Sequence, residues 1–76
     1  MQTTNFTKYR ITFYIGDEHE DFRERLKGEI KKLEEREIKY NVFKESDRLL
    51  PELCINGYCV IGLNEIQHEL KSFLSN

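Results

Sequence analysis

Two cysteines, Cys54 and Cys59, are the residues best suited to chemistry in this 76-residue chain. Asn56 and Gly57 lie between them, and Asn-Gly between two apolar runs is the strongest short-range signal for a two-residue hairpin turn. In such a hairpin the cysteines face each other at a non-hydrogen-bonded pair, with Cα atoms about 4.5 Å apart and side chains on one face. This spacing is near the lower limit for a disulfide, so a reducible cross-strand bridge is compatible with the sequence.

The cysteine pair has a second interpretation. Free cysteines often behave as small hydrophobes, and no cationic residue nearby in the sequence activates either thiol. We therefore favour two free thiols packed side by side over a disulfide. A metal site that adds His19 or His68 is weaker still, because a tight hairpin lacks the usual spacing of zinc ligands. We expect no metal and no cofactor, and we expect both histidines to be solvated on helix surfaces.

Composition argues against several classes of partner. Twelve Lys and Arg against fourteen Asp and Glu give a net charge of -2, too weak a field to recruit nucleic acid or an anionic membrane. No apolar run approaches the roughly 20 residues of a membrane helix, and residues 1–10 are too polar for a signal peptide. Two cysteines are too few for the disulfide framework of a small secreted domain. These observations favour a cytoplasmic protein that binds neither nucleic acid nor membrane.

Hydrophobic periodicity predicts the elements that must position the cysteines. Residues 10–15 alternate between apolar and polar side chains, as in a strand with one buried face, and residues 38–43 repeat that period. The two arms of the Asn-Gly hairpin supply two more strands. Capping-box spacings that begin at Asp17 and at Asn64 each predict the start of a helix with one apolar stripe.

The order strand, helix, strand, hairpin, helix predicts one α/β domain over residues 10–76, after a flexible segment at residues 1–9. A right-handed crossover makes the first two strands parallel, so the four strands form a mixed sheet with both helices on one face. The other face stays uncovered and semi-polar, as expected of a solvated or partner-facing sheet. Its predicted members are Thr12, Tyr14, Lys39, Asn41, Glu52, Cys54, Cys59 and Ile61.

Residues 50–62 are similar to part of a known family. They read Leu-Pro-Glu-Leu-Cys-Ile-Asn-Gly-Tyr-Cys-Val-Ile-Gly. This run resembles the glutaredoxin branch of the thioredoxin-like superfamily, in which a cis-proline opens a strand and a tight turn leads to a glycine-containing exit. The element order agrees with that family. The resemblance implies a minimal thioredoxin-like βαβββα fold, in which Pro51 is cis and helps to shape a peptide-binding surface.

The active-site motif of that family is missing. In the family, the loop after the first strand carries Cys-x-x-Cys or Cys-x-x-Ser, with a thiolate at a helix N-terminus. Here residues 16–21 read Gly-Asp-Glu-His-Glu-Asp, so disulfide exchange at that position is chemically excluded. The family's second helix is also missing, because residues 44–50 are too few to form it. Its loss reduces the glutathione groove, disfavours glutathione as a ligand and leaves the sheet face open.

Two functional hypotheses follow from these observations. The first is a non-catalytic thioredoxin-like module that binds another protein, or a second copy of itself, through the open face or an edge strand. The second is thiol-disulfide electron transfer by the hairpin cysteines as a relocated redox pair. We favour the first, since the conventional active-site cysteines that would make the chain an enzyme are absent. The residues expected to contact a partner are Tyr14, Asn41, Glu52 and Ile61.

Overall fold

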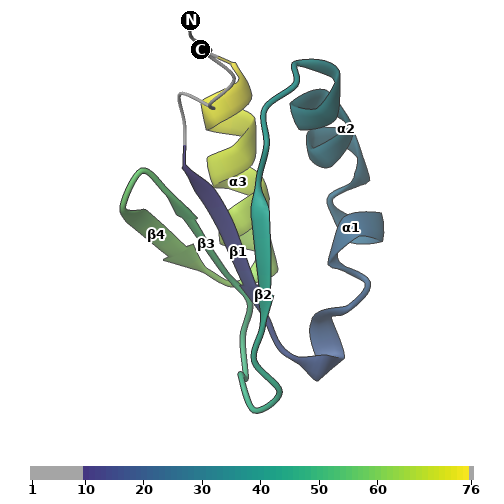
Figure 1. Ribbon diagram of the computed structural model, residues 1–76, viewed down its shortest axis with the longest axis vertical. Coiled ribbons are helices and arrows are strands. Elements are labelled where there is room, and N and C mark those ends of the chain that lie inside the picture. The colour runs from purple at the N-terminus through teal and green to yellow at the C-terminus, as the bar shows by residue number, and fades with distance from the viewer. Residues whose placement is uncertain (1–9, 76) are drawn as a thin grey trace, which may run out of the picture.

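A computed structural model describes residues 10–75 (Figure 1). The elements follow the predicted order, except that the first helix is divided into three pieces. In chain order they are β1 (Ile11–Ile15), the 3-10 helix η1 (Asp17–His19), α1 (Phe22–Arg25), α2 (Lys27–Glu35), β2 (Asn41–Lys44), β3 (Glu52–Ile55), β4 (Tyr58–Ile61) and α3 (Leu63–Leu74). The segment predicted to be flexible, residues 1–9, lies outside the described residues. No helix in the described part of the chain is long and apolar enough to cross a membrane.

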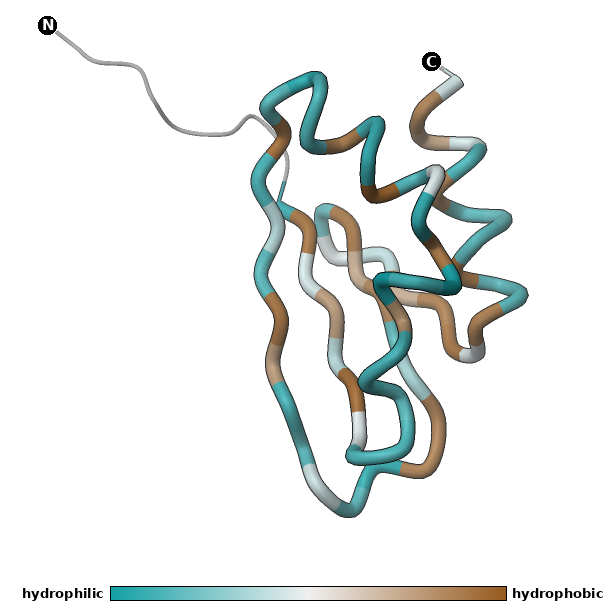
Figure 2. The backbone as a smooth tube through the Cα atoms, turned by 90° about the vertical axis from the view of Figure 1, so that its right-hand side faces the viewer, coloured by the Kyte–Doolittle hydropathy of each residue, from teal (hydrophilic) through white to brown (hydrophobic). Residues whose placement is uncertain are grey.

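The four strands form one mixed sheet in the order β2-β1-β3-β4, which confirms the predicted fold class. β1 and β2 run parallel, whereas β3 is antiparallel to both β1 and β4. The helices lie together on one side of this sheet (Figures 1 and 2), and no other element of residues 10–75 covers the opposite side. The arrangement is consistent with a minimal thioredoxin-like α/β fold.

The hydrophobic core lies between the sheet and the helices. β1 contributes Ile11, Phe13 and Ile15 to it, and β3 contributes Leu53 and Ile55. The helical side is supplied by the apolar stripes that the sequence predicts: Phe22, Leu26, Ile30, Leu33, Ile66, Leu70 and Leu74. Each of these core side chains is at most 7% exposed. The free energy gained from apolar burial therefore comes mainly from one face of the sheet.

The start of the first helix differs from the prediction. Gly16, not Asp17, is the N-cap residue of η1, and its backbone N–H donates to His19 Nδ1 at 2.9 Å. His19 is therefore half-buried and hydrogen-bonded to the backbone, and the expectation of an ordinary solvated histidine is wrong for His19. The helix is then interrupted at Leu26, which lies between α1 and α2 with a non-helical φ of -108° and ψ of 27°.

β2 begins at Asn41, later than the predicted residue 38. The delay arises because a Schellman cap extends the end of α2. Glu37 has a left-handed φ of 58°, and the following residue, Ile38, donates its backbone N–H to Leu33 O at 2.9 Å. The Ile38 amide is thus used by the helix end and not by the sheet, although Ile38 and Tyr40 still pack against the core as their alternation predicts.

The prediction of a cis bond at Pro51 is wrong. No peptide bond within residues 10–75 is cis, so the bond between Leu50 and Pro51 is trans. Trans is the intrinsically favoured isomer of such a bond by about 0.5–1 kcal/mol. The carbonyls on both sides of the bond are hydrogen-bonded in this geometry: Arg48 Nη1 donates to Leu50 O at 3.3 Å, and Gly62 N–H donates to Pro51 O at 2.8 Å.

Candidate functional site

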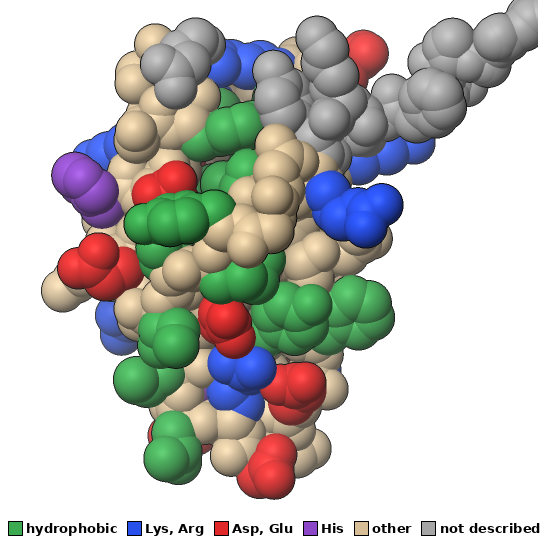
Figure 3. Space-filling model, turned by 90° about the vertical axis from the view of Figure 1, so that its left-hand side faces the viewer, with side chains coloured by type: hydrophobic (Ala, Val, Ile, Leu, Met, Phe, Trp, Pro, Cys, Tyr) green, Lys and Arg blue, Asp and Glu red, His purple; other side chains and the backbone are tan. Residues whose placement is uncertain are grey.

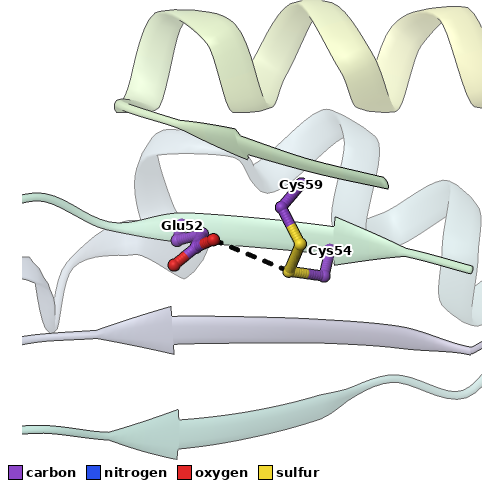
Figure 4. A group of neighbouring side chains, drawn as sticks. All are labelled: Glu52, Cys54 and Cys59. Carbon is purple, nitrogen blue, oxygen red and sulfur yellow. Dashed lines mark hydrogen bonds between the residues drawn. A yellow bond between two sulfur atoms is a disulfide. The ribbon is translucent and has the colours of Figure 1, made fainter. Parts of the chain in front are cut away.

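Cys54 on β3 and Cys59 on β4 lie opposite each other and form a disulfide (Figure 4). Their Cα atoms are 4.0 Å apart, as in the close, non-hydrogen-bonded pairs of an antiparallel ladder. The facing arrangement follows from the turn, since Asn56 and Gly57 adopt positive φ values of 51° and 92°. The sequence therefore predicts correctly that the two cysteines face each other across the hairpin.

The expectation of free thiols is wrong, because no cysteine in the described structure is free. That expectation treated the cysteines as small, partly buried hydrophobes. The structure places them on the uncovered face, as the alternation predicts, with Cys59 exposed and Cys54 half-buried. Neither side chain gains the apolar burial that would make packing its main role.

The strand register places the predicted partner residues around the disulfide. Two rows of side chains cross the open face: Asn41, Thr12, Cys54 and Cys59 in one, and Phe43, Tyr14, Glu52 and Ile61 in the next. The four residues expected to contact a partner thus share one face with the cysteines, as the alternation predicts. Lys39 precedes β2 and is not part of these rows.

Glu52 connects the disulfide to a neighbouring cation, Arg48. Arg48 Nη1 lies 3.1 Å from Glu52 Oε1, while the other carboxylate oxygen, Oε2, lies 3.8 Å from Cys54 Sγ (Figure 4). A disulfide sulfur carries no hydrogen, so in the oxidised protein this second contact is a close approach and not a hydrogen bond. Reduction would create a Cys54 thiol that can donate to Oε2. Glu52 therefore offers one oxygen to a guanidinium and the other to sulfur.

Arg48 is the site residue that sequence reasoning missed. Its Nε lies 2.7 Å from Glu45 Oε1, and its Cζ lies 5.4 Å from the centroid of the Tyr14 ring. Hydrogen bonds to Glu45 and, more weakly, to Glu52 raise the pKa of Arg48 above its ordinary value. Its side chain is 23% exposed, so these contacts hold it against the sheet. The only signal in the sequence was an arginine spaced three and four residues from two glutamates, within a segment expected to be a polar turn.

Apolar side chains lie on both sides of Glu52 in its row of the sheet, with Tyr14 on one side and Ile61 on the other. Tyr14 and Phe43 stack with ring centroids 5.7 Å apart. Phe43 is 54% exposed and Ile61 is 53% exposed, although both are large and apolar. Figure 3 shows hydrophobic side chains gathered on this side of the molecule, with acidic and basic side chains among them. A molecule that approaches the disulfide therefore meets an apolar rim, which consists of Tyr14, Phe43 and Ile61.

The two histidines do not join the cysteines. His19 Nδ1 accepts the Gly16 N–H in the loop after β1, and His68 is exposed on α3. Among the described residues, the group of potential metal ligands at the cysteine pair is completed by Glu52 and includes neither histidine.

The loop after β1 lies close to the segment before β3, since a Cβ added to Gly16 would lie 2.4 Å from Arg48 O.

No protein family, curated protein or solved structure shows a significant match to this chain. The resemblance to the thioredoxin-like superfamily therefore rests on the element order, on the strand order and on the sequence of residues 50–62, without the cis-proline of that family. What the site can do must follow from its own geometry: a disulfide on an open sheet face, a carboxylate beside it and an apolar rim around it.

Proposed function

We propose that this protein is a thiol-disulfide electron carrier of the thioredoxin-like superfamily, with Cys54 and Cys59 as its redox pair. The observation that carries the proposal is an accessible disulfide on the face of the sheet opposite the core. A disulfide that stabilises a fold usually closes a long loop. This one spans a sequence separation of only 5, for which the chain-entropy model gives about 2 kcal/mol. A chemical role explains its position better than a stabilising role does.

The hairpin can keep its shape in both oxidation states. The turn is set by the positive φ values of Asn56 and Gly57, and backbone pairing of β3 with β4 involves no sulfur. Reduction therefore breaks one covalent bond while the backbone that positions both sulfurs is preserved. Such preservation favours a reversible carrier, since each sulfur remains beside its partner for reoxidation.

Exchange begins at the more accessible sulfur, Cys59 Sγ. A thiolate of a partner dithiol attacks it, a mixed disulfide forms, and the electron pair of the broken bond leaves on Cys54 Sγ. The partner's second thiolate then attacks the partner's sulfur in the mixed disulfide. This attack releases the oxidised partner and the Cys59 thiolate. Two electrons have passed to the cysteine pair, and two protons complete its thiols. The new Cys54 thiol has Glu52 Oε2 as a nearby acceptor.

Intact-mass measurement after thiol alkylation, across a glutathione redox series, tests this proposal. The expected result is a reversible gain of two hydrogens at Cys54 and Cys59, with a midpoint within about -220 to -320 mV, the range of the cytoplasmic thiol pool. In the cytoplasm, where we place the protein, such a midpoint lets the pair cycle between its two states. The variant Cys59→Ser is the control and should show no two-hydrogen step. A bridge that stays closed across the series, or thiols that never pair, would overturn the proposal.

Protein binding through the open face is a second candidate function, favoured by the exposure of Phe43 and Ile61. The partner is another protein or a second copy of this chain. Sedimentation of the wild type and of Ile61→Glu over a concentration series tests self-association, because a buried carboxylate at this rim would disrupt it. Association that is lost in Ile61→Glu supports this function. A strictly monomeric protein that copurifies with no partner would contradict it.

A further inference from the structure

We propose that reduction converts the hairpin into a binding site for Zn²⁺, with Cys54 Sγ, Cys59 Sγ and Glu52 Oε2 as the ligands. These three side chains can each offer one ligand atom, and the three atoms lie within 4.8 Å of one another. Thiolate and carboxylate ligands suit Zn²⁺. This inference goes beyond electron transfer, because metal binding requires reduced thiols but no particular reduction potential.

The spacing of the ligand atoms fits a tetrahedral cation. With bonds of about 2.3 Å to sulfur and about 2.0 Å to oxygen, a tetrahedral Zn²⁺ holds the sulfur and oxygen about 3.5 Å apart. Cys54 Sγ and Glu52 Oε2 are already 3.8 Å apart. The two sulfurs must separate to about 3.8 Å, the span that the same bond length requires. Once the covalent bond is broken, rotation about each Cα–Cβ bond can provide that separation.

Arg48 orients Glu52 for this role. It binds Oε1 at 3.1 Å and leaves Oε2 directed at the sulfur (Figure 4). Carboxylates that bind metals are commonly held by a hydrogen bond of this kind. Two thiolates and one carboxylate carry three negative charges, of which a divalent cation offsets two, and the Arg48 guanidinium, which Glu52 shares with Glu45, lies beside the third.

Metal binding and disulfide formation exclude each other at this site. Binding releases two thiol protons for each cation and moves no electron, after a thiol reductant has broken the bridge and has itself become a disulfide. The oxidised protein offers no thiolate, so the site exists only in the reduced state. One tetrahedral position remains for water or for a donor from another molecule. Bound Zn²⁺ is thus expected to slow reoxidation of the pair.

Titration of the reduced, full-length protein with Co²⁺ under anaerobic conditions tests the site, since Co²⁺ accepts the same ligands and thiolate-to-cobalt absorption reports sulfur coordination. We expect saturation at one Co²⁺ per chain, displacement by Zn²⁺, and no thiolate absorption from oxidised protein or from Cys54→Ser. Glu52→Gln should weaken binding about tenfold or more. The matched control is Glu24→Gln, at an exposed glutamate of α1 on the helical side of the sheet, which should change the affinity by less than about twofold.

Two outcomes would overturn the three-ligand site. One is equal affinity of Glu52→Gln and the wild type, and the other is one Co²⁺ for every two chains, which would indicate four thiolates from a pair of chains. Circular dichroism of each variant verifies its fold, and Glu52→Gln keeps the test decisive even where a cysteine variant does not fold. A strong thiol reductant prepares the protein whatever its potential, so failure to equilibrate with glutathione would remove the redox proposal alone.

Discussion

The two faces of the sheet separate stability from chemistry within a single strand, β3. Leu53 is 0% exposed beneath the helices, whereas its neighbours Glu52 and Cys54 belong to the uncovered face. One face carries the core, and the other carries the disulfide and the ion pairs of Arg48. Because consecutive residues of a strand point in opposite directions, either face can change with little effect on the other.

Leu53→Ala is expected to have the largest effect. It leaves a cavity in the core and should lower the free energy of unfolding by about 2–5 kcal/mol, enough to unfold part of the population of so small a domain. Urea unfolding followed by circular dichroism measures the loss. Ile61→Ala is the matched aliphatic control on the open face, where the side chain is 53% exposed, and should stay within about 0.5 kcal/mol of the wild type. Equal losses would show that the open face also carries stability.

Replacing both cysteines by serine should have an intermediate effect. The double variant loses only a short closed loop, so its free energy of unfolding should fall by about 2 kcal/mol or less, with the fold retained. The same urea experiment on reduced wild type is the control and should give nearly the same value. A double variant without native circular dichroism would mean that the disulfide holds the fold together, contrary to the separation of the two faces.

Gly57→Ala probes the turn that makes the cysteines face each other. Gly57 has φ of 92° and no atom lies within 4 Å of an added Cβ, so the penalty is that of a left-handed L-residue, about 1–2 kcal/mol. The control is Gly28→Ala in α2, where an added Cβ is equally free and alanine should stabilise the helix by about 0.5–1 kcal/mol. Thermal melts should therefore shift in opposite directions. A stabilising Gly57→Ala would contradict the role of the turn.

The smallest effect is expected where the end of β2 meets η1. Lys44 Nζ donates to Glu20 Oε2 and lies 3.5 Å from Asp17, and the hydrogen bond to Glu20 raises the pKa of Lys44 above 10.5. A raised folded-state pKa stabilises the protein fully below the unfolded-state value and loses that contribution as pH rises through the folded value. Lys44→Met should melt slightly below the wild type at neutral pH, with the gap closing above pH 10.5. A gap that widens in alkali would reverse the sign of the interaction.

Local chemistry explains what the sequence could predict. Asn56 and Gly57 determine the turn, and through it the facing of the cysteines, because few other residues tolerate two successive positive φ values. Alternation along β1 and β3 predicts the correct face of the sheet for each side chain. This prediction is reliable because a register shifted by one residue would bury the charged Glu52 in place of the apolar Leu53. The α/β architecture and most of the candidate site therefore follow from short-range patterns.

Contacts between segments distant in the chain, or between loop residues, explain what the sequence could not predict. The wrong expectation of a cis bond at Pro51 came from the family resemblance, whereas the intrinsic preference of about 0.5–1 kcal/mol favours the trans isomer that the structure has. Arg48 meets Tyr14 only after the sheet has formed, and the role of His19 depends on the path of the loop after β1. Residue spacing brings Cys54 and Cys59 together, but it does not determine whether they are thiols or a disulfide.

The hairpin that carries the disulfide is the most local part of the sheet, and this affects the order in which the chain folds. Hairpins form within about 1–10 μs. Contacts such as the hydrogen bond from Arg10 N to Asn56 Oδ1 must close a separation of 46 residues and come later. Cys54 and Cys59 can therefore be oxidised in a nascent chain that has no core. Since the chain has no third cysteine, early oxidation cannot trap a wrong pairing within it.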